Sequence, residues 1–342
     1  MSQLAWPSSS PVGFSLPMVA LVVVYISLST TFGSIRIALA HLSPEVVVVW
    51  RFLLAALFLL PLGVGLGLIS TRNSSALKPL DWSARRLMWN GWIGCLVFVI
   101  GNGVLCYPLQ YISSGMAAGI IAFSPFFMVA LSRWIPPTEP FSRPVFQALL
   151  VGLCGIVLMI GGYQSAQQSQ VQSQVMLVYP LWIQWASMGL MMLVNICWVS
   201  GSLMIRQQRQ TFPQLCVDTA LQCLTAVIVF AGVSLFKGHS LNVMTYPVSA
   251  VGALMYLAWV GTCMGMLCYF YVLKTLPLAL TGSFAYVTPM LTMVLGVAFL
   301  NEPASPLMWV GMLFILASVI LIHRVTLSRN VSVIEKQEVA VS

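Results

Sequence analysis

Two hydroxyl–proline pairs inside apolar segments are the first residues of this sequence that suggest chemistry on a solute. Ser124-Pro125 and Thr288-Pro289 each stand near the middle of a long apolar run, and a Glu-Pro-x-Ser sequence follows each of them. A proline inside a helix leaves one backbone carbonyl without its usual donor, and in lipid that carbonyl must bind a neighbour, water or ligand. The adjacent hydroxyl could satisfy it locally, or kinks at Pro125 and Pro289 could line a central cavity. The sequence leaves both interpretations open.

Polar and aromatic residues in the apolar segments extend this candidate site. Asn102 lies between Gly101 and Gly103, and an amide in hydrocarbon needs hydrogen-bond partners. Tyr286 stands three residues before Pro289, so it lies near the same helix face and is the aromatic residue that we expect in the cavity. The predicted substrate-binding residues are Asn102, Tyr107, Ser124, Trp198, Tyr271, Tyr286 and Thr288. Core packing or a place at the membrane interface is the alternative for the aromatic residues.

Asp218 is the acidic residue that falls clearly inside an apolar segment. Acidic residues within membranes often relay protons or bind cations. A second interpretation is that Asp218 caps a helix beginning near Gln214, where a negative charge is favoured. In that case Asp218→Asn is expected to cost roughly 1 kcal/mol of stability or less.

Arg36 and Arg51 are basic residues within apolar segments. A charge at the centre of a bilayer costs at least about 2.5–3.5 kcal/mol on insertion scales. Each arginine is expected either to extend its guanidinium toward the interface or to pair with Glu45; the alternative is a contact with an anionic substrate group.

Residue patterns typical of enzymes and metal sites are missing. The three histidines lie far apart at segment ends, no lysine follows a glycine as in a phosphate-binding loop, and no cysteine pair has metal-ligand spacing. We therefore predict no catalytic residue, no metal and no cofactor. A membrane enzyme or a non-transporting sensor is the less favoured alternative and would need a polar cluster that the sequence does not show.

The composition indicates that lipid is the solvent around these residues. Hydrophobic residues make up 59% of the chain and charged residues 6%, against about 25% charged residues in soluble domains. The net charge of +8 comes from basic residues between apolar segments, which is typical of membrane-topology signals, so we expect no nucleic-acid partner.

A membrane span needs roughly 20 apolar residues. The sequence predicts ten such spans, at 16–38, 46–68, 88–109, 114–134, 145–163, 179–204, 214–236, 250–272, 278–299 and 306–323. If both termini are cytoplasmic, the inner loops hold every loop lysine and arginine except Lys237, as the positive-inside rule requires.

The chain is expected to be an all-α integral membrane protein with ten transmembrane helices in two inverted five-helix repeats. The repeat is read from the matched hydroxyl–proline pairs, and five spans per half make the halves opposite in orientation. The predicted divisions are a first repeat at 16–163, a polar periplasmic linker at 164–178, a second repeat at 179–323 and a disordered cytoplasmic tail at 324–342.

The order of short motifs across both halves resembles EamA-type permeases of the drug/metabolite transporter superfamily. The residues that carry the resemblance are Pro44, Arg51-Phe52, Gly101-Asn102-Gly103, Ser114 to Ala118, Ser124-Pro125, Gly152 to Ile156, Trp198 to Ser202 and Tyr286 to Pro289. One departure is Leu28-Ser29-Thr30, where family members usually have Trp-Gly-Ser or similar. The resemblance implies ten helices, two EamA repeats, a bacterial inner-membrane location and export of small metabolites or drugs.

The expected function is secondary transport by alternating access around a central cavity. The cargo is expected to be an amino acid, a similar amphipathic metabolite or a drug, and uptake is the alternative to export. Expected partners are the small-molecule substrate and the lipid bilayer, and the chain is expected to act as a monomer or homodimer.

Overall fold

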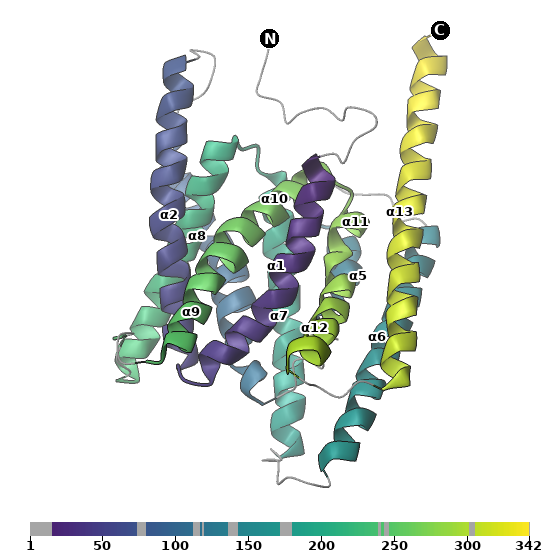
Figure 1. The fold of residues 1–342 in the computed structure, drawn as a ribbon. Helices are drawn as coiled ribbons and strands as arrows, with labels where there is room; N and C mark the ends of the chain where they lie inside the picture. The colour runs from purple at the N-terminus through teal and green to yellow at the C-terminus, as the bar shows by residue number, and fades with distance from the viewer. Residues whose placement is uncertain are drawn as a thin grey trace.

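The described chain is helical throughout. A computed structural model describes residues 16–73, 80–111, 117, 120–135, 143–171, 180–238, 241–242, 246–300 and 305–341, and among these residues there is no β-strand. Long helices run side by side in one bundle, and the start of α1 and the end of α13 lie at the same end of it (Figure 1). The expectation of an all-α protein is confirmed.

The described part of the first half contributes three long helices, α1, α2 and α6, a composite helix from α3 to η3, and the short α5. Its elements are α1 (Leu16–Leu39), α2 (Pro44–Asn73), α3 (Ala84–Gly94), η1 (Cys95–Gly103), η2 (Val104–Cys106), η3 (Pro108–Gln110), α5 (Ser124–Leu131) and α6 (Arg143–Val171). The second half has α7 (Leu181–Gln207), α8 (Phe212–Phe236), α9 (Val248–Tyr256), η4 (Leu257–Met264), α10 (Gly265–Thr275), α11 (Leu278–Gly282), α12 (Phe284–Leu300) and α13 (Pro306–Val341).

Six helical stretches of the described chain are long and apolar enough to cross a membrane. They are Leu16–Leu39, Pro44–Ser70, Ala84–Gln110, Trp185–Gln207, Phe212–Phe236 and Val248–Thr275, and shorter apolar helices cover Arg143–Leu158 and Pro306–Ile322. These stretches fall on eight of the predicted spans. The predicted fourth span lies partly outside the described residues, so the count of ten remains a prediction.

Two segment boundaries differ from the prediction. Helix α6 continues to Val171, through the first part of the predicted polar linker, and α13 continues to Val341, through the predicted disordered tail. Glutamine, serine and charged residues weaken a hydropathy signal, but they are compatible with a helix.

The two prolines of the repeated motif stand in different local structures. Pro125 occupies the first turn of α5, just after a turn at Ala122–Phe123. A proline there costs no helical hydrogen bond, because the first N–H groups of a helix have no intrahelical acceptor. Pro289 lies inside α12, as expected for a kink. The chain therefore breaks and restarts at Pro125, which differs from the predicted mid-helix kink.

Two π-helical segments occur at corresponding places in the two halves. Segment η1 follows α3, and η4 joins α9 to α10. Both segments adjoin glycines against which a neighbour packs tightly: a Cβ at Gly103 would lie 2.3 Å from the Phe230 ring, and one at Gly265 would lie 2.2 Å from Ser27 Oγ. The glycines thus allow side chains of neighbouring helices to pack directly against the backbone.

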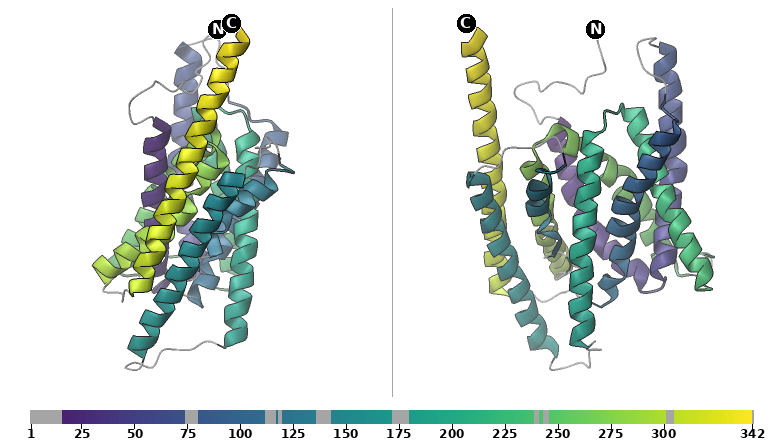
Figure 2. Two further views of the ribbon diagram at one scale, coloured as in Figure 1. Left: turned by 90° about the vertical axis from the view of Figure 1, so that its right-hand side faces the viewer. Right: turned by 180° about the vertical axis from the view of Figure 1, so that it is seen from behind.

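Two helix pairs dominate the packing. Helix α2 lies along α8, and α6 lies along α13 at one edge of the bundle (Figure 2). In the predicted repeat these pairs are the second span with the seventh and the fifth with the tenth. Close contact is possible in the edge pair because Gly155 faces the backbone of Gly311, where a Cβ would lie 2.7 Å from the carbonyl oxygen.

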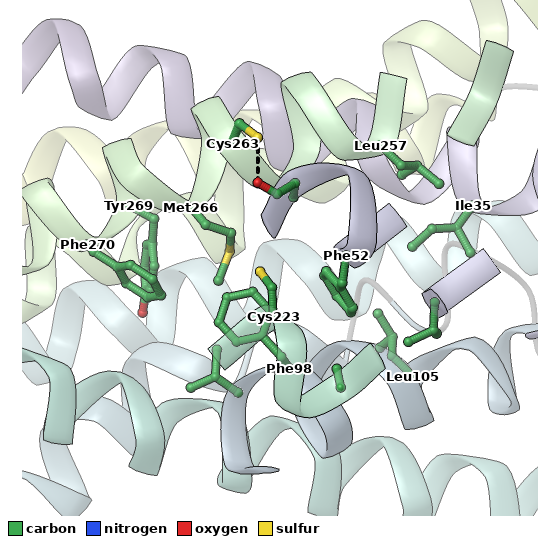
Figure 3. Close-up of a cluster of buried hydrophobic side chains, with 14 of the residues drawn as sticks. Ile35, Phe52, Phe98, Leu105, Cys223, Leu257, Cys263, Met266, Tyr269 and Phe270 are labelled. Carbon is green, nitrogen blue, oxygen red and sulfur yellow. Dashed lines mark hydrogen bonds between the residues drawn. The ribbon is translucent and has the colours of Figure 1, made fainter. Parts of the chain in front are cut away.

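The larger of two apolar clusters lies between α1, α2, η1, α8 and α10. Figure 3 shows Met266, Tyr269 and Phe270 of α10 pointing toward Phe98 and Cys223. This cluster and a smaller one between α6, α12 and α13 fix the helices that surround the candidate site.

Candidate functional site

A cavity of about 60 Å³ lies where α1, η1, α7, α10 and α12 meet. A water molecule needs about 15 Å³ of such volume, so the cavity has room for about four water molecules. Its walls are mainly apolar, and its polar lining residues are Thr31, Asn102, Asn195 and Thr288. An apolar pocket with a few placed polar groups is typical of a small-molecule site.

Three of the predicted substrate-binding residues line this cavity: Asn102, Trp198 and Thr288. The Nδ2 atom of Asn102 donates to the Val97 carbonyl of η1 at 2.8 Å, which leaves Oδ1 without a partner among the described residues. The Thr288 side chain is 2% exposed, and its hydroxyl also lacks a hydrogen-bond partner among the described residues. A buried hydroxyl without a partner is costly, so both groups are available to a bound solute.

Aromatic side chains form one wall. The Trp198 ring stacks on Tyr269 with centroids 4.8 Å apart, and it meets Phe284 edge-on at 5.4 Å. Phe284 and Thr288 are four residues apart in α12 and both line the cavity, as side chains at that spacing share a helix face. The position of Trp198 was predicted, but Phe284 was not, because an isolated phenylalanine in an apolar segment looks like any core residue.

Ser124 lies behind the cavity wall and is fully buried. Its hydroxyl is 2.6 Å from Oδ1 of Asn195 and also reaches the Ile121 carbonyl, the group that would bond residue 125 if that residue were not proline. The Asn195 Nδ2 atom donates to the Ile120 carbonyl at 3.0 Å. The carbonyls at the break before α5 are thus satisfied within the protein, which was the local alternative for this motif.

Asn195 is a site residue that the sequence prediction missed. It lines the cavity and bridges α7 to the break before α5. The available signal was an amide three residues before Trp198, a spacing that puts both side chains on one face of a helix.

The other predicted aromatic residues do not line the cavity. Tyr286 is fully buried in the smaller apolar cluster, and its hydroxyl donates to the Leu149 carbonyl at 3.1 Å. Tyr271 is buried in the larger cluster. Tyr286 is two residues from both Phe284 and Thr288, so it points to a different face of α12. Its proximity to Pro289 was a poor guide because Thr288, and not the proline, defines the cavity face.

The predicted residue Tyr107 belongs to a polar cluster near one end of α2. Its hydroxyl donates to Oε1 of Glu45 at 2.6 Å, and Lys237 Nζ lies 2.5 Å from the same oxygen. Lys237 also lies over the Tyr107 ring, 5.2 Å from its centroid. The cluster joins α2, the chain after η2 and the end of α8.

Asp218 is the centre of a buried polar network and not a helix cap. Helix α8 begins at Phe212, and its cap is Thr211, whose hydroxyl accepts a bond from the Gln214 N–H. The Asp218 carboxylate is fully buried and pairs with Arg86 of α3 through both oxygens, with Nε to Oδ1 at 3.1 Å. Further donors to the carboxylate are Asn90, Gln210 and Gln214. The capping interpretation is therefore wrong.

The two arginines within apolar segments differ. Arg36 is exposed in the last turn of α1, in keeping with an extended side chain. Arg51 is 2% exposed and donates from Nε to Thr262 Oγ1 at 2.9 Å. It forms no ion pair with Glu45 in the described structure, so neither expected arrangement fits Arg51.

The described residues contain no group of three or more histidine, cysteine or acidic side chains that could hold a metal ion. All eight cysteines are free. The polar groups around the cavity are amides and hydroxyls without a charged base or nucleophile, and such groups are suited to binding a solute.

Helices of membrane-spanning length around a small, mainly apolar cavity are the features of a multi-pass membrane protein. The profile of the EamA-like transporter family matches the chain twice, at residues 15–161 and 185–324. The chain therefore belongs to the EamA-like transporter family, and the resemblance seen in the sequence is confirmed.

Relatives and a solved structure extend over most of the chain. The Escherichia coli (strain K12) protein "Uncharacterized inner membrane transporter YedA" is 27% identical over 304 residues, which are 89% of both chains. The Bacillus subtilis (strain 168) protein "Uncharacterized transporter YyaM" is 22% identical over 85% of this chain and 88% of its own. A protein crystal structure matches with a TM-score of 0.67 at 17% identity, covering 91% of this chain and 98% of its own, and supports the fold alone.

Proposed function

We propose that this protein is a secondary transporter of the bacterial inner membrane that exports small amphipathic metabolites, such as amino acids, or drugs. The observation that carries the proposal is the cavity at the meeting point of both halves, with apolar walls and unpartnered polar atoms on Asn102 and Thr288. Membership of a transporter family and a relative named an inner membrane transporter support it.

Alternating access is the proposed mechanism. The cavity is lined by helices of both halves, so a movement of one half against the other would change its access to either side of the membrane. Two ion pairs between the halves lie away from the cavity: Lys237 and Asp218, near the two ends of α8, bind Glu45 and Arg86 of the first half. We propose that α8 keeps its place against α2 while the helices around the cavity move.

We further propose ten transmembrane helices in two inverted repeats with both termini in the cytoplasm. The paired packing of α2 with α8 and of α6 with α13, together with the matched π segments, supports a repeat. The start of α1 and the end of α13 share one end of the bundle (Figure 1), as an even number of crossings requires. Export is the direction that the family resemblance favours, and uptake is the alternative.

A substrate screen in proteoliposomes tests the proposal. Purified protein is reconstituted, and movement of labelled amino acids and cationic drugs is measured with and without a proton gradient. The expected result is saturable transport of at least one solute that falls by about tenfold or more in Thr288→Val. Transport that Thr288→Val and Asn102→Ala both leave unchanged would place the substrate outside this cavity.

A further inference from the structure

The guanidinium of Arg51 is buried in the bundle without a carboxylate partner. Its side chain is 2% exposed, and among the described residues its one hydrogen bond is that from Nε to Thr262. No described acidic residue forms an ion pair with it. Burying a charge in this way is strongly unfavourable unless another group compensates it.

The groups around Arg51 show no structural need for a charge there. The Thr262 hydroxyl, which accepts the Nε–H bond, also donates to the Leu257 carbonyl at 3.0 Å, so it stays bonded without the arginine. The guanidinium carbon lies 5.0 Å from the centroid of the Phe52 ring. A methionine of similar length could fill the same space without a buried charge.

The free edge of the guanidinium lies beside the cavity. A Cβ built on Gly261 would be 3.5 Å from Arg51 Nη2 and 3.0 Å from the hydroxyl of Thr31, which is a cavity-lining residue. Both distances are those of close contact, so only the backbone of Gly261 separates the guanidinium from a hydroxyl of the cavity wall. Because Nε is engaged, the terminal Nη1 and Nη2 atoms remain as two parallel donors, the arrangement that binds a carboxylate through both oxygens.

We propose that Arg51 is the anion-binding group of the transport site and that the cargo carries a carboxylate. This inference rests on the proposed transport function and narrows its cargo to carboxylate-bearing metabolites with an apolar body. When the helices around the cavity separate, the carboxylate reaches Nη1 and Nη2 past Gly261, and the apolar part lies against the wall formed by Trp198 and Phe284. A cationic drug without a carboxylate is then a poor cargo.

Matched pairs of solutes test the inference in proteoliposomes. Phenylalanine, leucine and threonine are each compared with their amides, which keep the amino group and side chain but lose the anionic charge. The wild type is expected to favour at least one acid over its amide by about tenfold or more in apparent affinity. In Arg51→Met the apparent affinities for an acid and its amide should differ by less than about twofold. The preference of Arg51→Lys should lie between those of the wild type and Arg51→Met, because an ammonium keeps the charge but not the paired donors.

Stability supplies a second readout that needs no solute. Without solute, Arg51→Met is expected to melt at or above the wild-type temperature, whereas a structural arginine would lower it by several degrees. Gly261→Ala keeps the charge and places a methyl group between the guanidinium and the Thr31 hydroxyl, so it should weaken binding of the acid selectively. Arg85→Gln, an exposed arginine of α3, is the matched control and should retain the wild-type preference.

The outcomes separate the inference from the transport function. Equal handling of acids and amides by a transporting wild type, an unchanged preference in Arg51→Met, or a lowered melting temperature of Arg51→Met would each overturn the inference while transport stands. A wild type that moves no solute of the panel or of the wider screen would remove the transport proposal and this inference with it.

Discussion

The Nζ atom of Lys237 lies 2.5 Å from Oε1 of Glu45, which links the C-terminal end of α8 to the first turn of α2. Glu45 is 1% exposed, whereas the Lys237 side chain is 43% exposed. Lys237→Met should therefore cost more than the about 0–1 kcal/mol of a surface pair, because the buried Glu45 carboxylate keeps only the Tyr107 hydroxyl and loses its positive partner. Glu45→Ala should cost more, since it removes the shared acceptor. Thermal melts of the two purified variants measure the difference, and equal losses would contradict it.

The Asp218–Arg86 pair should dominate the stability of its end of the bundle. Asp218→Asn leaves Arg86 only the longer contact of 3.7 Å with Asp81, which is half exposed, so we expect a loss of about 3–5 kcal/mol, well above the roughly 1 kcal/mol expected of a cap. The double variant Asp218→Leu/Arg86→Met should lose less than Asp218→Asn, because no unpaired charge remains. Denaturation of the single and double variants completes the test. A stable Asp218→Asn that had lost only gradient-driven transport would instead indicate proton coupling.

Tyr286 should behave as a packing residue. Truncation to alanine opens a void among α6, α12 and α13 and removes the hydrogen bond to the Leu149 carbonyl, so Tyr286→Ala should destabilise by about 3–5 kcal/mol. Tyr286→Phe removes the hydroxyl alone and should cost about 1 kcal/mol. Melting and transport are measured on the same preparations. A stable but inactive Tyr286→Ala would restore the original expectation of a cavity role.

Thr288 offers the reverse pattern. Its hydroxyl has no partner among the described residues, so Thr288→Val should leave the melting temperature unchanged or slightly higher while it lowers transport by about tenfold. Thr288→Ser keeps the hydroxyl and should retain most transport. If Thr288→Val lost stability instead, the hydroxyl would have a structural partner.

The proposed topology has a direct test. In a background free of native cysteines, Gln168→Cys should react with an impermeant thiol reagent from outside intact cells, and Ser74→Cys should react only after permeabilisation. The opposite pattern would invert the orientation.

The sequence predicted the helices well because each long apolar run has a single stable outcome in lipid. Of the residues predicted from the sequence to bind substrate, Asn102, Trp198 and Thr288 line the cavity. Their types are unusual in hydrocarbon, or they lie in a repeated motif. Helix ends were less predictable: polar residues near Val171 and Val341 continue their helices because nothing in the local backbone stops them.

Contacts between distant residues were beyond the sequence alone. Arg86 and Asp218 lie 132 residues apart, and nothing local to either residue specifies their pairing. Tyr286 was misplaced by the rotation of a helix, because a difference of two positions turns a side chain by roughly 200°. Such errors concern which face of a helix meets which neighbour, and tertiary packing decides that.

The π-helical segments η1 and η4 have more residues in a turn than an ordinary α-helix. Each N–H in such a turn reaches back five residues instead of four. Relaxation to α-helical bonding would shift the register beyond the segment by about one residue, a rotation of about 100° at 3.6 residues per turn. In η1 the shift moves Asn102, and beyond η4 it moves Met266, both of which line the cavity. A register shift at η1 or η4 would therefore turn side chains that line the cavity, while the backbone stays hydrogen-bonded in lipid.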